Sequence, residues 1–260
     1  MLNVSETELG TPEATWRNAP QLVGLRRMSW GAPSRVVVVA PHPDDEVLAV
    51  GGSVRHLAAR GAEVVVVAVT DGEASHPGSR AMTPPDLARA RRAERTAALR
   101  TLGVGEPVVD RLRVPDGQVV RFEQEVASVL LDHLGPDTVC LATWQHDGHP
   151  DHEATGRAAS DAAHTAGATF VEYPVWAWHW ATPDGGSTPE RPHALPWGRA
   201  RRHDLDAPSR RDKVAAIGAY TTQIAPIGPD PADRRVLPNA VLDRFRRPFE
   251  VLFLPETAPT

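Results

Sequence analysis

Over the first 172 residues of this chain, short apolar runs alternate with longer stretches whose hydrophobic residues recur at helical spacing. Short apolar runs predict strands, and the β-branched runs at 35–40 and 138–143 have the composition of strands buried on both faces. The other predicted strands lie at 63–69, 107–112 and 168–172. Between them, stretches with helical spacing predict helices at 46–60, 85–102, 121–134 and 152–166. This alternation predicts a doubly wound, mostly parallel α/β sheet of Rossmann-like type, with helices on both faces.

The pattern weakens towards both ends of the chain. Beyond residue 172 it predicts only a helix at 210–219 and a short strand at 249–254, so we expect an irregular C-terminal extension. Residues 1–30 are weakly patterned and are expected to form an N-terminal extension. Because 260 residues can bury one sizeable core, residues 31–260 are expected to form a single domain.

Polar side chains crowd the end of the first predicted strand, in Pro41-His-Pro-Asp-Asp-Glu46. A single aspartate at a strand-to-helix junction is explained as a helix cap. Two aspartates together with a histidine are not, because crowded carboxylates are costly unless a cation absorbs their charge. The carboxyl edge of an open parallel sheet is also where ligands bind.

A second cluster, Trp144-Gln-His-Asp-Gly-His-Pro-Asp-His152, follows the predicted strand at 138–143 and opens another helix. Two such loops at one sheet edge would bring their imidazoles and carboxylates together. Two histidines and one aspartate, with a fourth position open to water, form the ligand set of a hydrolytic zinc site. Nitrogen and oxygen ligands suit Zn²⁺ better than Mg²⁺ or Ca²⁺, with iron or another divalent ion as the alternative.

The two clusters resemble the signatures of the PIG-L/LmbE-like family of zinc-dependent N-acetylglucosaminyl deacetylases. The resemblance spans roughly residues 35–254 and includes weaker matches in the same order: Thr70-Asp-Gly-Glu73, Arg91 with Glu94, Leu102-Gly-Val104, Pro115-Asp-Gly117, and Lys213 with Tyr220 and Gln223. It implies a deacetylase domain at 31–260 that removes the acetyl group from a 2-acetamido sugar conjugate, releasing acetate and a free amine. A small-molecule amino-sugar conjugate is therefore the expected partner.

The resemblance also implies a role for each residue of the two clusters. Asp44 would remove a proton from water, and His149 would stabilise the oxyanion or protonate the departing amine. Asp151 would orient an imidazole from behind. The implied metal ligands are His42, Asp45 and His152.

Five further residues are expected to contact the substrate. Arg91 and Asp116 match positions that face the sugar in the family, and Asp147 is a candidate of the same kind. Trp176 and Trp178 belong to the segment Val175-Trp-Ala-Trp-His-Trp180, in which three indoles alternate and would share one face of a strand. They would form either a platform for a sugar or an aromatic aglycone, or an apolar patch packed beneath a loop.

Composition narrows the class of protein. A net charge of −5 and a pI near 6.1 provide no electrostatic footprint for nucleic acid. No apolar stretch approaches the ~18 residues of a membrane span, and the first residues lack a basic leader, which predicts a cytoplasmic protein. The single cysteine, Cys140, is expected to be a small core residue. A homo-oligomer is compatible with the sequence.

Three alternatives remain open at this point. The same metal chemistry would serve an amidase acting on another N-acyl or thiol-conjugate substrate. A nucleotide-binding α/β domain would need a glycine-rich turn after the first strand, where this chain has Pro41–Glu46. The third alternative is a metal-binding module without activity. Only Asp44 argues against it, because a purely structural metal site does not require this second carboxylate.

Overall fold

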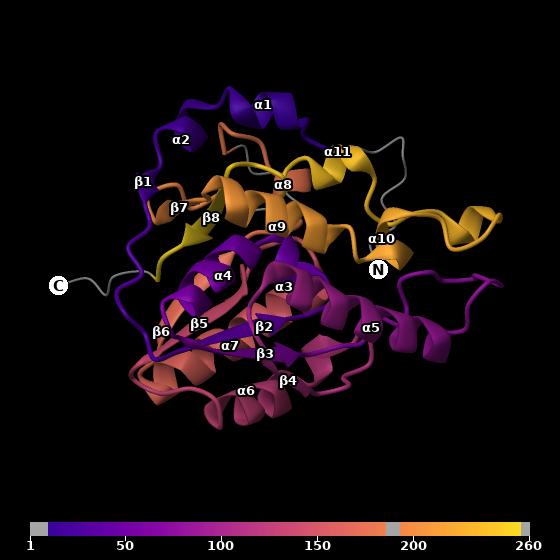
Figure 1. Ribbon diagram of the computed structural model, residues 1–260, viewed down its shortest axis with the longest axis horizontal. Coiled ribbons are helices and arrows are strands. Elements are labelled where there is room, and N and C mark those ends of the chain that lie inside the picture. The colour runs from indigo at the N-terminus through magenta and orange to yellow at the C-terminus, as the bar shows by residue number, and fades with distance from the viewer. Residues whose placement is uncertain (1–9, 186–192, 256–260) are drawn as a thin grey trace.

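The computed structural model describes residues 10–185 and 193–255. They form one mixed sheet of 8 strands in the order β1-β7-β8-β6-β5-β2-β3-β4, with helices on both faces (Figure 1). The central strands are parallel and β8 runs antiparallel to β6 and β7, so the predicted mostly parallel α/β fold is confirmed. The strands are β1 (Arg26–Arg27), β2 (Arg35–Ala40), β3 (Glu63–Ala68), β4 (Val108–Arg111), β5 (Thr138–Thr143), β6 (Thr169–Tyr173), β7 (Ala200–Asp204) and β8 (Phe249–Phe253).

The longer helices connect these strands as the pattern predicts. The helices of eight residues or more are α4 (Gly51–Ala59), α5 (Pro84–Leu102), α6 (Glu123–Leu131), α7 (Pro150–Ala166) and α9 (Ala207–Ile217). Gly103 and Gly167 end α5 and α7 in the left-handed conformation that glycine adopts without strain. The predicted helix at 121–134 is shorter than expected: it is preceded by the 3₁₀ turn Val119–Arg121 and ends at Leu131.

The predicted helix at 46–60 is two helices, α3 (Asp45–Leu48) and α4, separated at Val50. Their separation has a specific cause in the C-terminal part of the chain. The buried carboxylate of Glu250 on β8 accepts hydrogen bonds from the backbone N–H groups of Gly52 and Ser53, both at 2.7 Å. A carboxylate on the first N–H groups of a helix stabilises a helix start at that point. Lys213 of α9 neutralises the same carboxylate at 2.6 Å.

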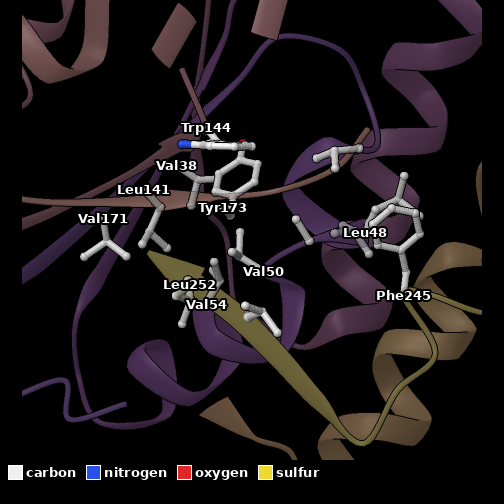
Figure 2. Packing of buried hydrophobic residues seen from close by; sticks show 14 of the residues in the cluster. Val38, Leu48, Val50, Val54, Leu141, Trp144, Val171, Tyr173, Phe245 and Leu252 are labelled. Atoms are coloured by element: carbon white, nitrogen blue, oxygen red, sulfur yellow. The ribbon is translucent and has the colours of Figure 1, made fainter. Parts of the chain in front are cut away.

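The core lies on both faces of the sheet, because alternate side chains of β2 point to opposite sides. Val36 and Val38 belong to one apolar cluster, and Val37 and Val39 belong to the other. Figure 2 shows part of the first cluster, where β2, β5 and β6 side chains meet Val50, Val54 and Leu252. The second cluster lies beneath α6 and α7.

Both chain ends contribute more structure than the sequence pattern predicts. Helices α1 (Glu13–Arg17) and α2 (Pro20–Val23) pack against the rest of the fold, and Trp16 is fully buried. Its indole N–H donates to the carbonyl of Trp178 at 3.0 Å. The C-terminal region extends the sheet with β7 and β8, and its remaining short elements are α10 (Thr221–Ile224), the 3₁₀ turn Pro231–Asp233 and α11 (Asn239–Leu242).

No helix in the described part of the chain is long and apolar enough to cross a membrane. Cys140 is buried in β5, and burial raises the pKa of its thiol to about 12. The cysteine is therefore a core residue, as expected from its position in an apolar strand.

Candidate metal and catalytic site

The two His/Asp clusters meet at the carboxyl edge of the sheet, because β2 and β5 are parallel neighbours in register. They open into a pocket that is continuous with solvent. Its polar lining residues are His42, Asp44, Asp45, Ser75, Arg91, Asp116, His149 and Gln223. Its apolar lining residues are Leu48, Val175, Trp176, Val236 and Leu237.

Three atoms at the base of the pocket are spaced like the ligands of one cation. His42 Nδ1 lies 3.1 Å from His152 Nε2, and Asp45 Oδ2 lies 3.4 Å from the first and 3.3 Å from the second. For a tetrahedral ion with bonds of about 2.0–2.1 Å, ligand atoms stand about 3.3–3.4 Å apart. The donor set and its spacing therefore fit a divalent metal ion.

Carboxylates behind the two histidines fix which ring nitrogen faces this position. His152 Nδ1 lies 2.8 Å from Asp147 Oδ2, which leaves Nε2 directed at the other two ligand atoms. His42 Nε2 lies 3.3 Å from both Asp116 Oδ1 and Asp151 Oδ2. Carboxylates in this position orient metal-bound imidazoles and raise their basicity. Asp151 thus contacts the imidazole of His42, at the ring nitrogen that faces away from the other two ligand atoms.

His149 is close enough to His42 and His152 for the three rings to form an alternative ligand group. Its Nδ1, however, accepts a hydrogen bond from the backbone N–H of Asp151 at 3.2 Å, where His149 caps α7. Burial, aided by the charges of His152 and His42, lowers the pKa of His149 far below its ordinary value. A neutral ring with Nδ1 accepting carries its proton on Nε2. His149 therefore offers a hydrogen-bond donor to the pocket.

Asp44 lines the pocket in an unusual backbone conformation, with φ 132° and ψ −31°. Its carboxylate is paired with Arg91, whose Nη2 lies 3.2 Å from Asp44 Oδ2 and also donates to the carbonyl of Pro43 at 2.8 Å. Burial raises the pKa of Asp44 to about 8, against the opposing charge of Arg91 and with the support of Asp45 and Glu46. A bound cation would oppose this shift.

His42 and Asp45 have pKa values shifted in opposite directions in the metal-free protein. Burial acts to lower the pKa of His42, but hydrogen bonds to Asp116, Asp151 and Asp45 outweigh it and raise that pKa well above the ordinary value. Burial also opposes ionisation of Asp45, yet His152 and His42 lower its pKa. His42 and Asp45 therefore favour opposite charges within the buried cluster.

The role of Glu46, whose carboxylate binds the backbone of Asp44, was not predicted from the sequence. The Glu46 carboxylate is buried and accepts from the backbone N–H of Asp44 at 3.2 Å, from Arg95 Nε at 3.1 Å and from the Tyr220 hydroxyl at 2.9 Å. In the sequence, Tyr220 is indicated only by its match to the family pattern. Arg95 lies four residues after Arg91 on α5, so helical spacing alone indicated that both face the same side.

The expected substrate contacts divide into those that line the pocket and those that do not. Arg91, Asp116 and Trp176 line it, so their contact with substrate stays a prediction. Asp147 is fully buried below the pocket, where His152 and backbone N–H groups occupy its carboxylate, which corrects the expectation that it meets substrate.

The alternating tryptophans do not share one face of a strand. Residues Ala177–Trp180 form the short helix α8, so the shared face expected for a strand is not formed. Trp178 lies away from the pocket and packs edge-on against Trp16, with their ring centroids 5.1 Å apart. The Arg247 guanidinium covers the Trp178 ring at 4.4 Å. Trp178 therefore belongs to the apolar core, and Trp176 alone of the two faces the pocket.

Comparison with known families agrees with this geometry. The PIG-L family model, described as GlcNAc-PI de-N-acetylase, matches residues 37–163, which contain both His/Asp clusters. Over these residues the chain is similar to the PIG-L family. A 1D-myo-inositol 2-acetamido-2-deoxy-alpha-D-glucopyranoside deacetylase of Mycolicibacterium gilvum (strain PYR-GCK) is 35% identical over 159 residues, covering 51% of this chain and 55% of the relative. The chain spans about half the length of the first curated relatives it matches.

Longer similarities at lower identity extend over more of the chain. The corresponding deacetylase of Mycolicibacterium vanbaalenii is 29% identical over 245 residues, covering 76% of this chain and 83% of the relative. The solved structure of A40926 pseudoaglycone deacetylase shares the fold at a TM-score of 0.61 and 24% identity, covering 88% of this chain and all of that one. The 4-carboxy-2-hydroxymuconate hydratase of Pseudomonas putida, at a TM-score of 0.57 and 18% identity, covers 87% and 99%. Fold alone therefore does not determine the reaction.

Proposed function

We propose that this protein is a zinc-dependent N-deacetylase that hydrolyses the acetamide of a 2-acetamido sugar conjugate. The observation that carries the proposal is the triangle of His42 Nδ1, Asp45 Oδ2 and His152 Nε2, at the base of a pocket that also contains Asp44 and His149. The matched family and the curated relatives are named as deacetylases of N-acetylglucosamine compounds, which supports the same substrate class.

Zinc is the proposed ion because two imidazole nitrogens and one carboxylate oxygen match its ligand preferences, with iron as the alternative. A bound zinc ion would supply Lewis acidity and would lower the pKa of water in its open position. The carboxylates of Asp116, Asp151 and Asp147 hold the two imidazoles in the orientation that presents a lone pair to the ion.

In this proposal Asp44 is the general base. Its carboxylate lines the pocket next to the ligand Asp45, and Arg91 holds one of its oxygens at 3.2 Å. Asp44 accepts a proton from the attacking water as the new carbon–oxygen bond forms, and the same proton then passes to the amine as the carbon–nitrogen bond breaks. One water and one amide thereby yield acetate and a free amine.

His149 is proposed to stabilise the negative charge that develops on the amide oxygen. Because its Nδ1 accepts from the Asp151 backbone, the Nε2–H group is the part of the ring available as a donor. The lowered pKa of His149 favours this donor role over that of a general acid. A donor of this kind contributes typically 10²–10³-fold to a rate.

The pocket walls indicate how the substrate is held. Ser75, Arg91, Asp116 and Gln223 offer hydrogen bonds to sugar hydroxyls, and the Trp176 side of the pocket offers apolar surface to a sugar face or aglycone. An N-acetylglucosaminyl conjugate is therefore the first substrate to test.

The proposal is tested by mass-spectrometric detection of products from an N-acetylglucosaminyl inositol incubated with zinc-loaded protein. We expect acetate and the free amine in equal amounts, loss of both after chelation and recovery on adding Zn²⁺. An intact conjugate after incubation with zinc-loaded protein would contradict the proposal.

An amidase with another acyl specificity is the second candidate, because five apolar side chains line the pocket beside the metal ligands. The same assay separates the two candidates when N-propanoyl and N-octanoyl conjugates are compared with the N-acetyl compound. Preferential release of a longer acid would favour the amidase.

A further inference from the structure

Asp147 lies in the loop after β5 and is completely shielded from solvent. Its carboxylate receives four hydrogen bonds. One contact joins Oδ2 to His152 Nδ1 at 2.8 Å. The others come from the backbone N–H groups of Val175 at 2.8 Å, Trp176 at 2.8 Å and Ala177 at 3.0 Å. A carboxylate has about four acceptor sites, so this one is saturated without any arginine or lysine.

This arrangement determines the tautomer of His152. Asp147 can only accept at its ionised oxygen, so His152 Nδ1 must carry the hydrogen. The lone pair of the neutral ring is then on Nε2, which faces His42 Nδ1 at 3.1 Å and Asp45 Oδ2 at 3.3 Å. The tautomer that can bind a metal ion at this position is thus the one that Asp147 selects.

The same carboxylate also fixes one wall of the pocket. Val175 and Trp176 line the pocket, and their backbone N–H groups are two of the three that Asp147 binds. These N–H groups precede or begin the short helix α8, where no preceding turn supplies acceptors for them. Asp147 therefore joins a metal ligand on α7 to the apolar wall that follows β6.

We propose that Asp147 is a positioning residue that holds His152 as an Nε2 ligand and ties the 175–177 wall to the metal site. The inference rests on the metal site of the proposed function, but it does not depend on which substrate is hydrolysed. It also accounts for a buried anionic side chain that the pocket itself does not reach.

Asparagine is the informative replacement, because it has the same shape but its amide nitrogen only donates. In Asp147→Asn two of the four donors must face the amide nitrogen, because each carboxylate oxygen accepts two of them. If these are His152 Nδ1 and the Trp176 N–H, the ring must move its hydrogen to Nε2, where it blocks the lone pair. If they are the Val175 and Ala177 N–H groups, the 175–177 wall loses both hydrogen bonds. Replacing a group that orients a metal-bound histidine typically weakens metal binding 10–100-fold.

The experiment measures Zn²⁺ affinity by competition with a chromophoric chelator, for the full chain, for Asp147→Asn and for Asp161→Asn. Asp161 is an exposed aspartate on α7, the helix that carries His152, and is the matched control. We expect a 10–100-fold loss for Asp147→Asn and none for Asp161→Asn. Circular dichroism and a melting curve verify that each variant is folded. Affinity within twofold of the unmodified chain in folded Asp147→Asn would overturn the proposal.

A second measurement reports the tautomer of His152 directly. Long-range ¹H–¹⁵N NMR of the unmodified chain with Zn²⁺ reports which nitrogen of His152 carries hydrogen, with assignment by His152→Gln. We expect hydrogen on Nδ1 and none on Nε2, and the opposite tautomer would overturn the proposal. Both measurements use the metal alone. A protein that releases no acetate but shows these results would refute the deacetylase assignment and leave the role of Asp147 standing.

Discussion

The backbone of Asp44 is predicted to store strain that glycine would relieve. Asp44 is one of two non-glycine residues with positive φ in the described part of the chain. Its carbonyl accepts from the N–H groups of Val47 and Leu48 at 3.0 and 2.8 Å, while Arg91 and Glu46 hold the residue from either side. A residue held in such a region costs roughly 1–3 kcal/mol, and such strain is found at functional sites.

Comparing Asp44→Gly with Asp44→Ala isolates this strain. Both variants lose the carboxylate, its pairing with Arg91 and its repulsion by neighbouring acids, and they differ only in the β-carbon. Glycine recovers roughly 1–3 kcal/mol of strain but loses about 0.4–1 kcal/mol through the freedom of its unfolded chain. The glycine variant should therefore be more stable by about 1 kcal/mol.

Urea unfolding of both variants at 25 °C, without metal and with Zn²⁺, measures the difference as a shift in midpoint at constant slope. By thermal melting, about 1 kcal/mol corresponds to roughly 2 °C in a chain of this length. An alanine variant as stable as the glycine variant, or more stable, would refute the strain and with it the view that Arg91 and Glu46 impose the geometry of Asp44.

Three other predictions concern the core, the support of Asp44 and the metal. Trp16→Ala should destabilise the protein by about 3–5 kcal/mol in urea unfolding because Trp16 is fully buried, and a loss below 1 kcal/mol would show that α1 is dispensable. Glu46→Gln should cost about 3–5 kcal/mol in the same assay, since it leaves the buried Arg95 uncompensated, and unchanged stability would contradict that pairing. Zn²⁺ binding should release protons and tighten as pH rises from 6 to 8, because the metal binds neutral His42, whose pKa is raised in the metal-free protein. Calorimetry in buffers of different ionisation enthalpy measures the protons released, and a binding enthalpy that does not depend on the buffer would contradict this prediction.

The central sheet and the meeting of the two clusters were predictable from the sequence. Runs such as Val36–Val39 are apolar on both faces, which only a covered parallel strand explains. Since such strands end at a common edge, His42 and His152 had to be near each other once β2 and β5 were both placed in the sheet.

The parts that escaped prediction depend on distant contacts. Trp16 is buried because Trp178, 162 positions away, accepts its N–H group, and no local pattern signals that pairing. The alternating tryptophans would share one face only on a strand, but Asp147 binds three consecutive N–H groups at the start of this segment and favours a turn into α8. Glu250 likewise divides the first helix from the opposite end of the sequence.

The most direct test of the account is the rate of acetate release from an N-acetylglucosaminyl conjugate by zinc-loaded protein, compared with that of zinc-loaded Asp44→Asn. We expect measurable turnover by the unmodified chain and a kcat lower by about 10²–10⁴ in the variant, with zinc still bound, because the variant lacks the proposed base. Equal rates in the two proteins, or no acetate from either, would contradict the assignment of Asp44 and of the reaction.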